Sequence, residues 1–239
     1  MQELIKDLCK QLRLGAHIAE SYDDIQATSN EEFLYKILKE AVEARETERK
    51  NRYIKQAGFD LIKSFEGFDF SGVTLPSGVS QEILRSCDFV KNKQNLILYG
   101  RPGTGKTHLA TALGVEACTL GHKTLYFKTS RLVNLLSEAR KTNTEARFWK
   151  KLSQAEVLIL DEWGYIPFER VGTQLLFEAI SECYEKRSVI ITTNLPFDEW
   201  NTIFYDQKLT TAILDRLVHH GLLLMHEGQS YRLQHSKMQ

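Results

Sequence analysis

The residues best suited to chemistry form one glycine-rich run that ends in a lysine and a hydroxyl. Their spacing matches the pattern G-x-x-x-x-G-K-[ST], which is typical of loops that bind nucleotide phosphates. Glycines let successive backbone N–H groups point inward at phosphate oxygens, the lysine supplies a movable positive charge, and the hydroxyl can bind Mg²⁺. We therefore predict that ATP and Mg²⁺ bind at Gly100, Arg101, Pro102, Gly103, Thr104, Gly105, Lys106, Thr107 and the adjacent His108.

A pair of carboxylates forms a second candidate site. Asp161 and Glu162 follow the apolar run 157–160, so they are predicted to lie at the carboxyl end of a buried strand, the edge where open α/β sheets bind ligands. We expect Asp161 to hold Mg²⁺ through water and Glu162 to orient or deprotonate an attacking water, while Lys106 neutralises phosphate charge. The pair thus indicates ATP hydrolysis; the alternative is a chance acidic pair after a strand.

Two later residues are predicted to be catalytic as well. Asn194 ends the run SVIITTN, where its amide can contact the γ-phosphate or the attacking water, although a cap before Pro196 is an alternative role. Arg216 lies in the helical stretch TAILDRLV. It is a candidate arginine finger, which would stabilise transition-state charge in a neighbouring subunit. A surface ion pair with Asp215 or with another residue is the alternative for this arginine.

Charge is balanced over the whole chain but not along it. The sequence has 31 basic and 31 acidic residues, whereas residues 122–151 carry eight basic and two acidic ones, a local charge of +6. Such a cluster attracts phosphates without reading bases, so duplex DNA is a predicted partner. Solvated helix faces are the alternative explanation. The predicted DNA contacts are Arg131, Arg140, Lys141, Arg147 and Lys150.

Histidine and cysteine patterns do not predict a metal centre. His219 and His220 are adjacent, so on a helix their side chains point about 100° apart, and we interpret them as structural. The four cysteines are isolated and lack C-x-x-C spacing, which favours buried thiols over disulfides or a zinc site.

The elements that must position these residues alternate in type after Pro76. Short apolar runs are consistent with buried parallel strands, and stretches of helical period separate them. This alternation predicts an α/β fold with a doubly wound parallel sheet. The stretch GLLLMHEGQSYRL is expected to form two strands around a Glu-Gly turn. The strand runs are NLILYG, TLYFK, VLILDEWG and SVIITTN, and the helical ones are KTHLATALGVEACTLG, SRLVNLLSEARK and VGTQLLFEAISECYEKR.

Residues 1–66 are predicted to form a small helical module that contacts a neighbouring subunit or a partner, and residues 67–239 an ATPase domain. Residues with helical spacing and a Ser-Asn start signal make up most of the module, Gly58 ends this helical run, and a glycine-rich connector leads to the boundary near Gly67. The sequence contains neither an apolar stretch of about 18 to 20 residues nor a cleavable signal. We therefore expect a cytoplasmic protein with no membrane contact.

The motifs together resemble an AAA+ ATPase over roughly residue 65 to the end. The resemblance is carried by GRPGTGKT, VLILDEWG, IITTN and ILDRL. The segments EGFDFSGV, LDEWGYIPF, TTNLPFDEW and GQSYRL are more specific and are similar to the IstB branch of the DnaA/DnaC-like clade. For that family the resemblance implies an ATPase that oligomerises on target DNA and assists a partner transposase in DNA transposition.

The resemblance also implies roles for particular positions. Lys106 and Thr107 become the nucleotide and Mg²⁺ residues, with Asp161–Glu162 as the acid pair, Asn194 as the polar sensor and Arg216 as the finger. A helical insertion that lies along DNA falls on residues 129–151. Little chain follows ILDRLVHHG in this sequence, so we do not expect the separate helical lid of a full AAA+ module. Its sensor arginine then has only Arg232 as a weak candidate.

Three other functions compete with this one. A DnaC-type replicative helicase loader has the same ATPase core but serves a helicase. A binding module would use ATP structurally without hydrolysis, which the intact acid pair argues against. A small-molecule kinase needs an acceptor pocket and an arginine-rich lid, and the sequence indicates neither.

Overall fold

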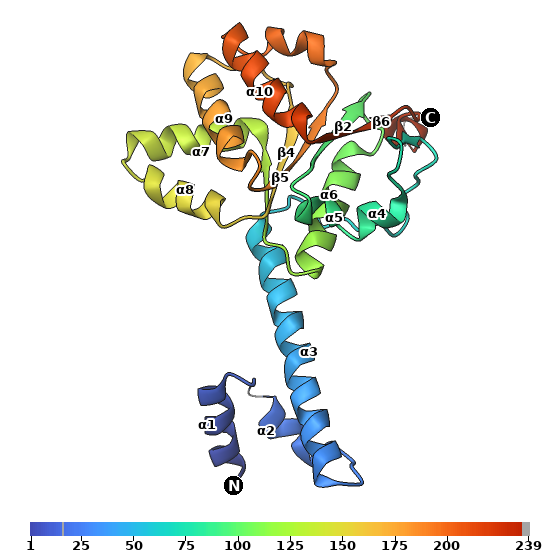
Figure 1. Ribbon diagram of the computed structural model, residues 1–239, viewed down its shortest axis with the longest axis vertical. Coiled ribbons are helices and arrows are strands. Elements are labelled where there is room, and N and C mark those ends of the chain that lie inside the picture. Colours follow the sequence, from blue (N-terminus) through green and yellow to red (C-terminus); the bar gives the residue numbers. More distant parts are fainter. Residues whose placement is uncertain (16, 236–239) are drawn as a thin grey trace. The chain divides into compact units, whose positions relative to one another are not determined.

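Figure 1 shows the computed structural model of the protein, which describes residues 1–15 and 17–235. The chain divides into two compact units, Met1–Arg52 and Tyr53–Gln239. The division falls within helix α3 (Asn30–Ala57), earlier in the chain than the boundary predicted near Gly67. The phosphate-loop motif and both carboxylates belong to the larger unit.

The smaller unit is helical, as predicted. It contains α1 (Gln2–Leu12), α2 (Ile18–Ser21), the 3-10 helix η1 (Tyr22–Asp24) and the first part of α3. The Ser29 hydroxyl accepts a hydrogen bond from the Glu32 N–H at 3.1 Å, which confirms the predicted start signal of α3. That helix ends before Gly58, whose φ of 81° is a left-handed conformation that favours glycine. The unit's small core consists of Cys9, Ile18 and Ala41, with Ile5, Leu14 and Ile37 packed against it.

Within residues 53–235, the larger unit is built around one six-stranded sheet in the order β1-β6-β2-β5-β4-β3. The strands from β6 to β3 pair in parallel, and β1 pairs antiparallel with β6 at one edge. Strand β2 lies between β5 and β6. After β2 the chain crosses to β3 at the far edge, returns through β4 to β5, and then passes to β6 on the other side of β2. Such a reversal of strand order opens a ligand crevice at the carboxyl ends of the strands. The strands are β1 (Val73–Thr74), β2 (Asn95–Gly100), β3 (Thr124–Lys128), β4 (Val157–Trp163), β5 (Ser188–Thr193) and β6 (Gly221–His226).

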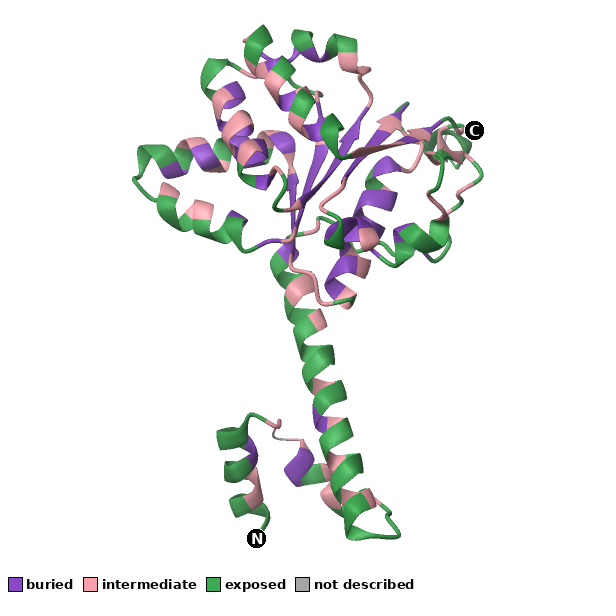
Figure 2. Cartoon of the chain, in the orientation of Figure 1, coloured by how far each residue is buried: buried purple, intermediate pink, exposed green. Residues whose placement is uncertain are grey.

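Helices cover both faces of this sheet, because successive strand residues point to opposite faces and both sets are apolar. Leu96 and Leu98 pack on the side of α6, whereas Ile97 packs on the side of α7, α9 and α10. Figure 2 shows the strands as the most continuously buried part of this unit. The three layers confirm the predicted α/β fold. The helices are α4 (Gln81–Arg85), α5 (Asp88–Lys91), α6 (Lys106–Thr119), α7 (Thr129–Lys141), α8 (Glu145–Ser153), α9 (Arg170–Cys183), η2 (Phe197–Thr202), α10 (Gln207–His219) and α11 (Tyr231–Gln234).

The prediction of two strands after α10 is half wrong. The first forms as β6, but the residues after the Glu227-Gly228 turn begin the short helix α11 instead of returning as a strand. The physical reason is a local cap, because the Ser230 hydroxyl accepts a hydrogen bond from the Leu233 N–H. The antiparallel neighbour of β6 is β1, from the connector before the sheet.

The cysteines behave as predicted, since Cys9, Cys87, Cys118 and Cys183 are all buried and free. In the part of the chain that the structure describes, every helix is too short or too polar to cross a bilayer.

Candidate nucleotide-binding site

The glycine-rich loop runs from the end of β2 into the first turn of α6, as its sequence pattern requires. Lys106 is buried there, and its Nζ donates hydrogen bonds to the carbonyls of Gly100 at 2.6 Å and Arg101 at 2.8 Å. Burial lowers the pKa of this ammonium to about 8, and the nearby Asp161 carboxylate opposes the shift. A positive charge is thus held inside the loop at the N-terminal end of a helix, where phosphate oxygens bind readily.

The glycines of the loop also admit the chain segment that follows β6. A Cβ at Gly100 would overlap the His226 carbonyl, and one at Gly103, where φ is 84°, would overlap the Ser230 hydroxyl. Two hydrogen bonds fix this approach: the Tyr231 N–H donates to the Gly103 carbonyl at 3.0 Å, and His226 Nδ1 donates to the Thr104 carbonyl at 2.9 Å. Residues 226–231 therefore brace the phosphate loop, which the sequence did not indicate.

His108 contributes differently from the other residues of the motif. Its Nε2 lies 2.8 Å from the Ser64 carbonyl, and its ring lies 5.1 Å from that of Phe68. The Phe68 ring in turn lies against Gly105. The structure thus places His108 between the loop and the connector before β1, on the outside of the phosphate-binding turn.

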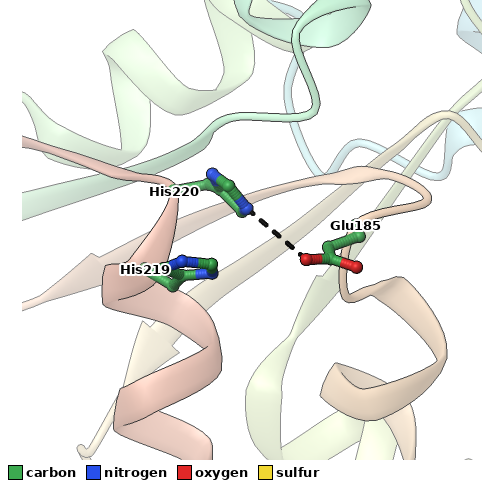
Figure 3. A group of neighbouring side chains, drawn as sticks. All are labelled: Glu185, His219 and His220. Atoms are coloured by element: carbon green, nitrogen blue, oxygen red, sulfur yellow. Dashed lines mark ion pairs between the residues drawn. The ribbon is translucent and has the colours of Figure 1, made fainter.

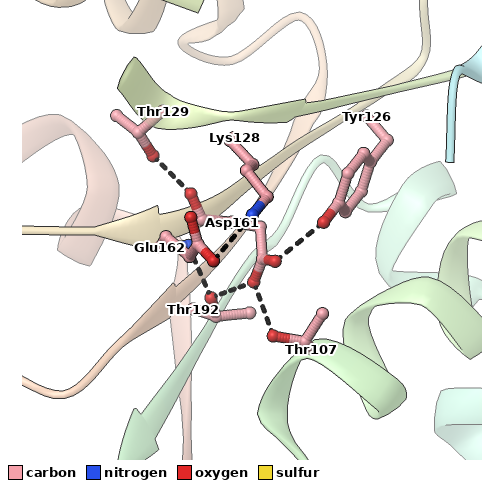
Figure 4. A network of polar contacts seen from close by, with 7 residues as sticks. All are labelled: Thr107, Tyr126, Lys128, Thr129, Asp161, Glu162 and Thr192. Atoms are coloured by element: carbon pink, nitrogen blue, oxygen red, sulfur yellow. Dashed lines mark hydrogen bonds and ion pairs between the residues drawn. The ribbon is translucent and has the colours of Figure 1, made fainter. Parts of the chain in front are cut away.

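Asp161, on β4, is the centre of a hydrogen-bond network that connects this strand to α6, β3 and β5 (Figure 4). The residue is 1% exposed, and its carboxylate accepts hydrogen bonds from the hydroxyls of Thr107 at 2.9 Å, Tyr126 at 2.7 Å and Thr192. The Tyr126 pKa is raised by burial and by this carboxylate. Because Thr107 and Asp161 supply adjacent oxygen ligands, the pair fits the coordination preference of Mg²⁺.

Glu162 lies at a β-bulge. Between β4 and β5 the pairing Leu160–Ile191 is followed by Trp163–Thr193, so two residues of β4 face one residue of β5. Glu162 has a φ of 58°, a conformation that non-glycine residues rarely adopt and that occurs preferentially at functional sites. Its N–H donates to the Thr192 hydroxyl at 3.0 Å. The bulge therefore aims Glu162 separately from Asp161, as bulges beside active sites do.

The Glu162 carboxylate forms an ion pair with Lys128, a residue of the basic segment 122–151. Lys128 Nζ lies 3.0 Å from Glu162 Oε1, and this contact raises the Lys128 pKa. Lys128 ends β3 and pairs in register with Asp161 on β4. Sequence reasoning missed Tyr126, Lys128 and Thr192, although all three lie at or near the carboxyl ends of predicted strands, and that position was the available signal.

Asn194 follows β5 at the same edge of the sheet, next to the pair of Thr193 with Tyr99, which precedes the phosphate loop. Its Oδ1 is buried and has no hydrogen-bond partner among the described residues. Pro196, not Asn194, is the N-cap residue of η2. The structure thus leaves a buried amide oxygen at the edge where the loop and the acid pair meet.

Arg216 does not join the site of its own chain. It lies on α10 beside the start of β2, because Asn95 Nδ2 donates to the Leu217 carbonyl at 3.0 Å, whereas the phosphate loop follows the end of β2. Six strand residues separate the two ends by about 17 Å. The guanidinium lies 4.9 Å from the Phe177 ring centroid, and in residues 1–15 and 17–235 it forms no ion pair with Asp215.

The five predicted DNA contacts are all exposed, and they lie on α7 and α8. Arg147 also lines the groove between these two helices, together with Glu138, Phe148 and Lys151. Arg140 differs from the others, because it is paired with Glu145 at 2.6 Å and Glu178 at 3.0 Å. The remaining four are Arg131, Lys141, Arg147 and Lys150.

Comparisons with known proteins identify the family. The family model described as IstB-like ATP binding protein matches residues 9–239. A Pseudomonas aeruginosa protein of insertion sequence IS21, named as ATP-binding, is 38% identical over 242 residues, which cover 98% of this chain and 89% of that protein. A Geobacillus stearothermophilus protein of insertion sequence IS5376, also named as ATP-binding, is 34% identical over 250 residues, covering 100% and 97%.

Solved structures agree on the fold. DnaA from Aquifex aeolicus, bound to AMPPCP, superposes with a TM-score of 0.55 at 20% identity over 72% of this chain, which spans 52% of that DnaA chain. The DnaC helicase loader superposes with a TM-score of 0.50 at 24% identity, covering 73% of this chain and 98% of that one. With the phosphate loop, the acid pair and the whole-length family match, the chain belongs to the IstB-like ATP-binding proteins of insertion sequences and has the AAA+ P-loop fold.

Proposed function

We propose that this protein is an ATP-hydrolysing regulator of DNA transposition, which oligomerises on target DNA and recruits or stimulates a partner transposase. The observation that carries the proposal is the network at the end of β4: Asp161 is held by Thr107 and Thr192, and the adjacent bulge presents Glu162 separately. A protein that only binds ATP has no need of a second carboxylate in a rare backbone conformation. The insertion-sequence relatives support the transposition setting.

Each residue of the site has a distinct proposed task. Lys106 and the loop N–H groups hold the phosphates, and Thr107 with Asp161 holds Mg²⁺, whose charge would polarise the γ-phosphate. Once the Glu162 carboxylate has separated from Lys128, it accepts a proton from the attacking water. The unpartnered Asn194 oxygen is suited to accept a hydrogen bond from that same water.

The surface of α7 and α8 is the proposed DNA contact. Within residues 1–15 and 17–235, the other four predicted contacts form no ion pair of the kind that Arg140 has, so they are available to phosphates. We expect contact to the backbone of the duplex, with affinity that falls steeply as salt rises. Arg140 should contribute less, because its charge is already balanced by Glu145 and Glu178.

Self-association is proposed from two separate features. Arg216 lies too far from its own phosphate loop, so its task as an arginine finger requires a neighbouring subunit. In the smaller unit, leucines spaced four residues apart are exposed on two helices, Leu4 and Leu8 on α1 and Leu34 and Leu38 on α3. Exposed leucine rows of this kind mark protein contact surfaces, and we assign this one to the neighbouring subunit.

The test combines steady-state phosphate release with sedimentation, each with and without nonspecific duplex DNA, at low and at raised salt. We expect ATP and DNA together to produce large, salt-sensitive assemblies with faster hydrolysis. Glu162→Gln should assemble but not turn over, and Arg216→Ala should bind ATP yet hydrolyse it slowly at any concentration. Wild-type protein that stays small and hydrolyses ATP equally well without DNA would contradict the assembly proposal.

A helicase loader of the DnaC type is the second candidate, since the superposition with this protein covers 98% of the DnaC chain. That likeness concerns fold alone, whereas identity of 38% over almost the full length is to an insertion-sequence protein. Affinity capture with the transposase of the same element and with a replicative helicase distinguishes the two. Retention of the helicase alone would favour the loader.

A further inference from the structure

The adjacent histidines His219 and His220 do not diverge as two residues of one helix would. Helix α10 ends at His219, and His220 has left the helical conformation, with φ of −116° and ψ of 31°. Their ring centroids are consequently 4.1 Å apart. We interpreted these histidines as structural from the sequence because two adjacent side chains on a helix point about 100° apart, and that premise is therefore wrong.

A carboxylate from another element completes a cluster with this pair. Glu185 follows α9, and one potential ligand atom from each of the three residues lies within 4.8 Å of the others (Figure 3). His220 Nε2 is 3.8 Å from Glu185 Oε1. All three side chains are exposed, so rotation about their side-chain bonds can close the remaining distance. The cluster lies just before β5 and β6, at the amino ends of these strands, whereas the nucleotide site lies at the carboxyl ends.

We propose that Glu185, His219 and His220 form a binding site for Zn²⁺, with water as the remaining ligand. Two imidazoles and a carboxylate are a donor set that zinc accepts at distances of about 2.0 to 2.2 Å. Mg²⁺ and Ca²⁺ prefer oxygen ligands, so neither competes well for two ring nitrogens. The ion would join the end of α9 to the end of α10.

A neighbouring hydroxyl supports one of these ligands in the manner of a metal site. The Tyr184 hydroxyl lies 2.9 Å from His219 Nδ1, and its ring stacks on that histidine with centroids 6.0 Å apart. Engagement of Nδ1 leaves Nε2 of His219 for the ion, and such outer contacts fix the ring of a ligating histidine. The Arg216 guanidinium lies 5.9 Å from the same Tyr184 ring.

This arrangement places the zinc site beside the candidate arginine finger. Binding of the ion would hold the last turn of α10 and the Tyr184 ring against which Arg216 lies, and so would steady Arg216 for the neighbouring subunit. This consequence rests on the proposed function, whereas zinc binding itself does not.

The test titrates the full chain with Zn²⁺ against a chromophoric chelator, without nucleotide or DNA and with excess Mg²⁺ to occupy oxygen sites. We expect one equivalent to bind to the wild type. The double variant His219→Ala/His220→Ala should lose at least about tenfold in affinity, and Tyr184→Phe about tenfold, as outer-contact variants do. His235→Ala, which removes an exposed histidine elsewhere, should titrate like the wild type.

Either of two results would overturn the site: a wild type that takes no zinc from the chelator, or a double variant that binds as tightly as the wild type. Thermal melting checks that the variants fold. We expect them to fold because the replaced histidines are exposed. Because the titration contains neither ATP nor DNA, its failure leaves the proposed ATPase untouched, and failure of the ATPase leaves the zinc titration valid.

Discussion

Replacement of Lys128 by methionine should raise the basal rate of ATP hydrolysis. In the structure, Lys128 Nζ lies 3.0 Å from Glu162 Oε1, so the carboxylate must leave this cation before it can accept a proton from water. The two side chains are 41% and 39% exposed, and ion pairs at such exposure are worth about 0 to 1 kcal/mol. Loss of the pair should therefore accelerate turnover by up to about fivefold. Methionine keeps an unbranched side chain of similar length and removes the ammonium group with its charge and its hydrogen bond.

The assay is steady-state phosphate release at saturating ATP, without DNA and at fixed salt, since Lys128 also belongs to the basic segment 122–151. Lys123→Met is the matched control, because Lys123 precedes the other end of β3 and contacts Gln154 instead of the acid pair. In a Glu162→Gln background the acceleration should vanish. Turnover that falls in Lys128→Met, or that rises equally in Lys123→Met, would refute a restraining role for the ion pair.

Three further predictions follow from the same geometry. Tyr126→Phe removes one hydrogen bond to the buried Asp161 carboxylate and should lower the free energy of unfolding by about 2 kcal/mol in urea titrations; an unchanged midpoint would show that the bond is not stabilising. Because the Lys106 pKa is lowered to about 8, the amine loses its charge as the pH rises past that value, so ATP affinity measured by calorimetry should fall between about pH 7 and 9. Lys106→Arg, which stays charged, should lose that pH dependence. Arg147→Gln should weaken duplex binding at every sequence and reduce the slope of log affinity against log salt by about 1, whereas Arg140→Gln should change the slope less. Equal slopes in fluorescence anisotropy titrations would contradict the distinction drawn from the Arg140 ion pairs.

Much of the fold follows from local sequence patterns. The runs NLILYG and TLYFK match β2 and β3 in full, because buried parallel strands need continuous apolar residues and the chain offers few other such runs. The phosphate loop was predictable for a similar reason, since its glycines, lysine and threonine act through a fixed local spacing. The acid pair needed only the rule that ligands bind at the carboxyl ends of strands.

The parts that escaped prediction depend on contacts between distant segments. Glu162 adopts its left-handed conformation because β4 slips by one residue against β5, and register is a property of two strands. The contacts of Thr192 and Lys128 with the acid pair arise from the same side-by-side arrangement. His219 and His220 looked inert because the carboxylate near them comes from a different loop, and α10 happens to end between them.

The bracing of the phosphate loop by β6 and the segment after it has a consequence for how the protein folds. His226 and Thr104 are separated by 122 positions in the chain, yet their hydrogen bond helps shape the turn that would surround the phosphates. Contacts of such high sequence separation form late, because a long loop must close before they are gained. A growing chain that has already produced every motif residue from Gly100 to Glu162 would therefore still lack a finished nucleotide pocket. ATP can stabilise the fold only after β6 has entered the sheet, so binding reports the completed domain and not its early intermediates.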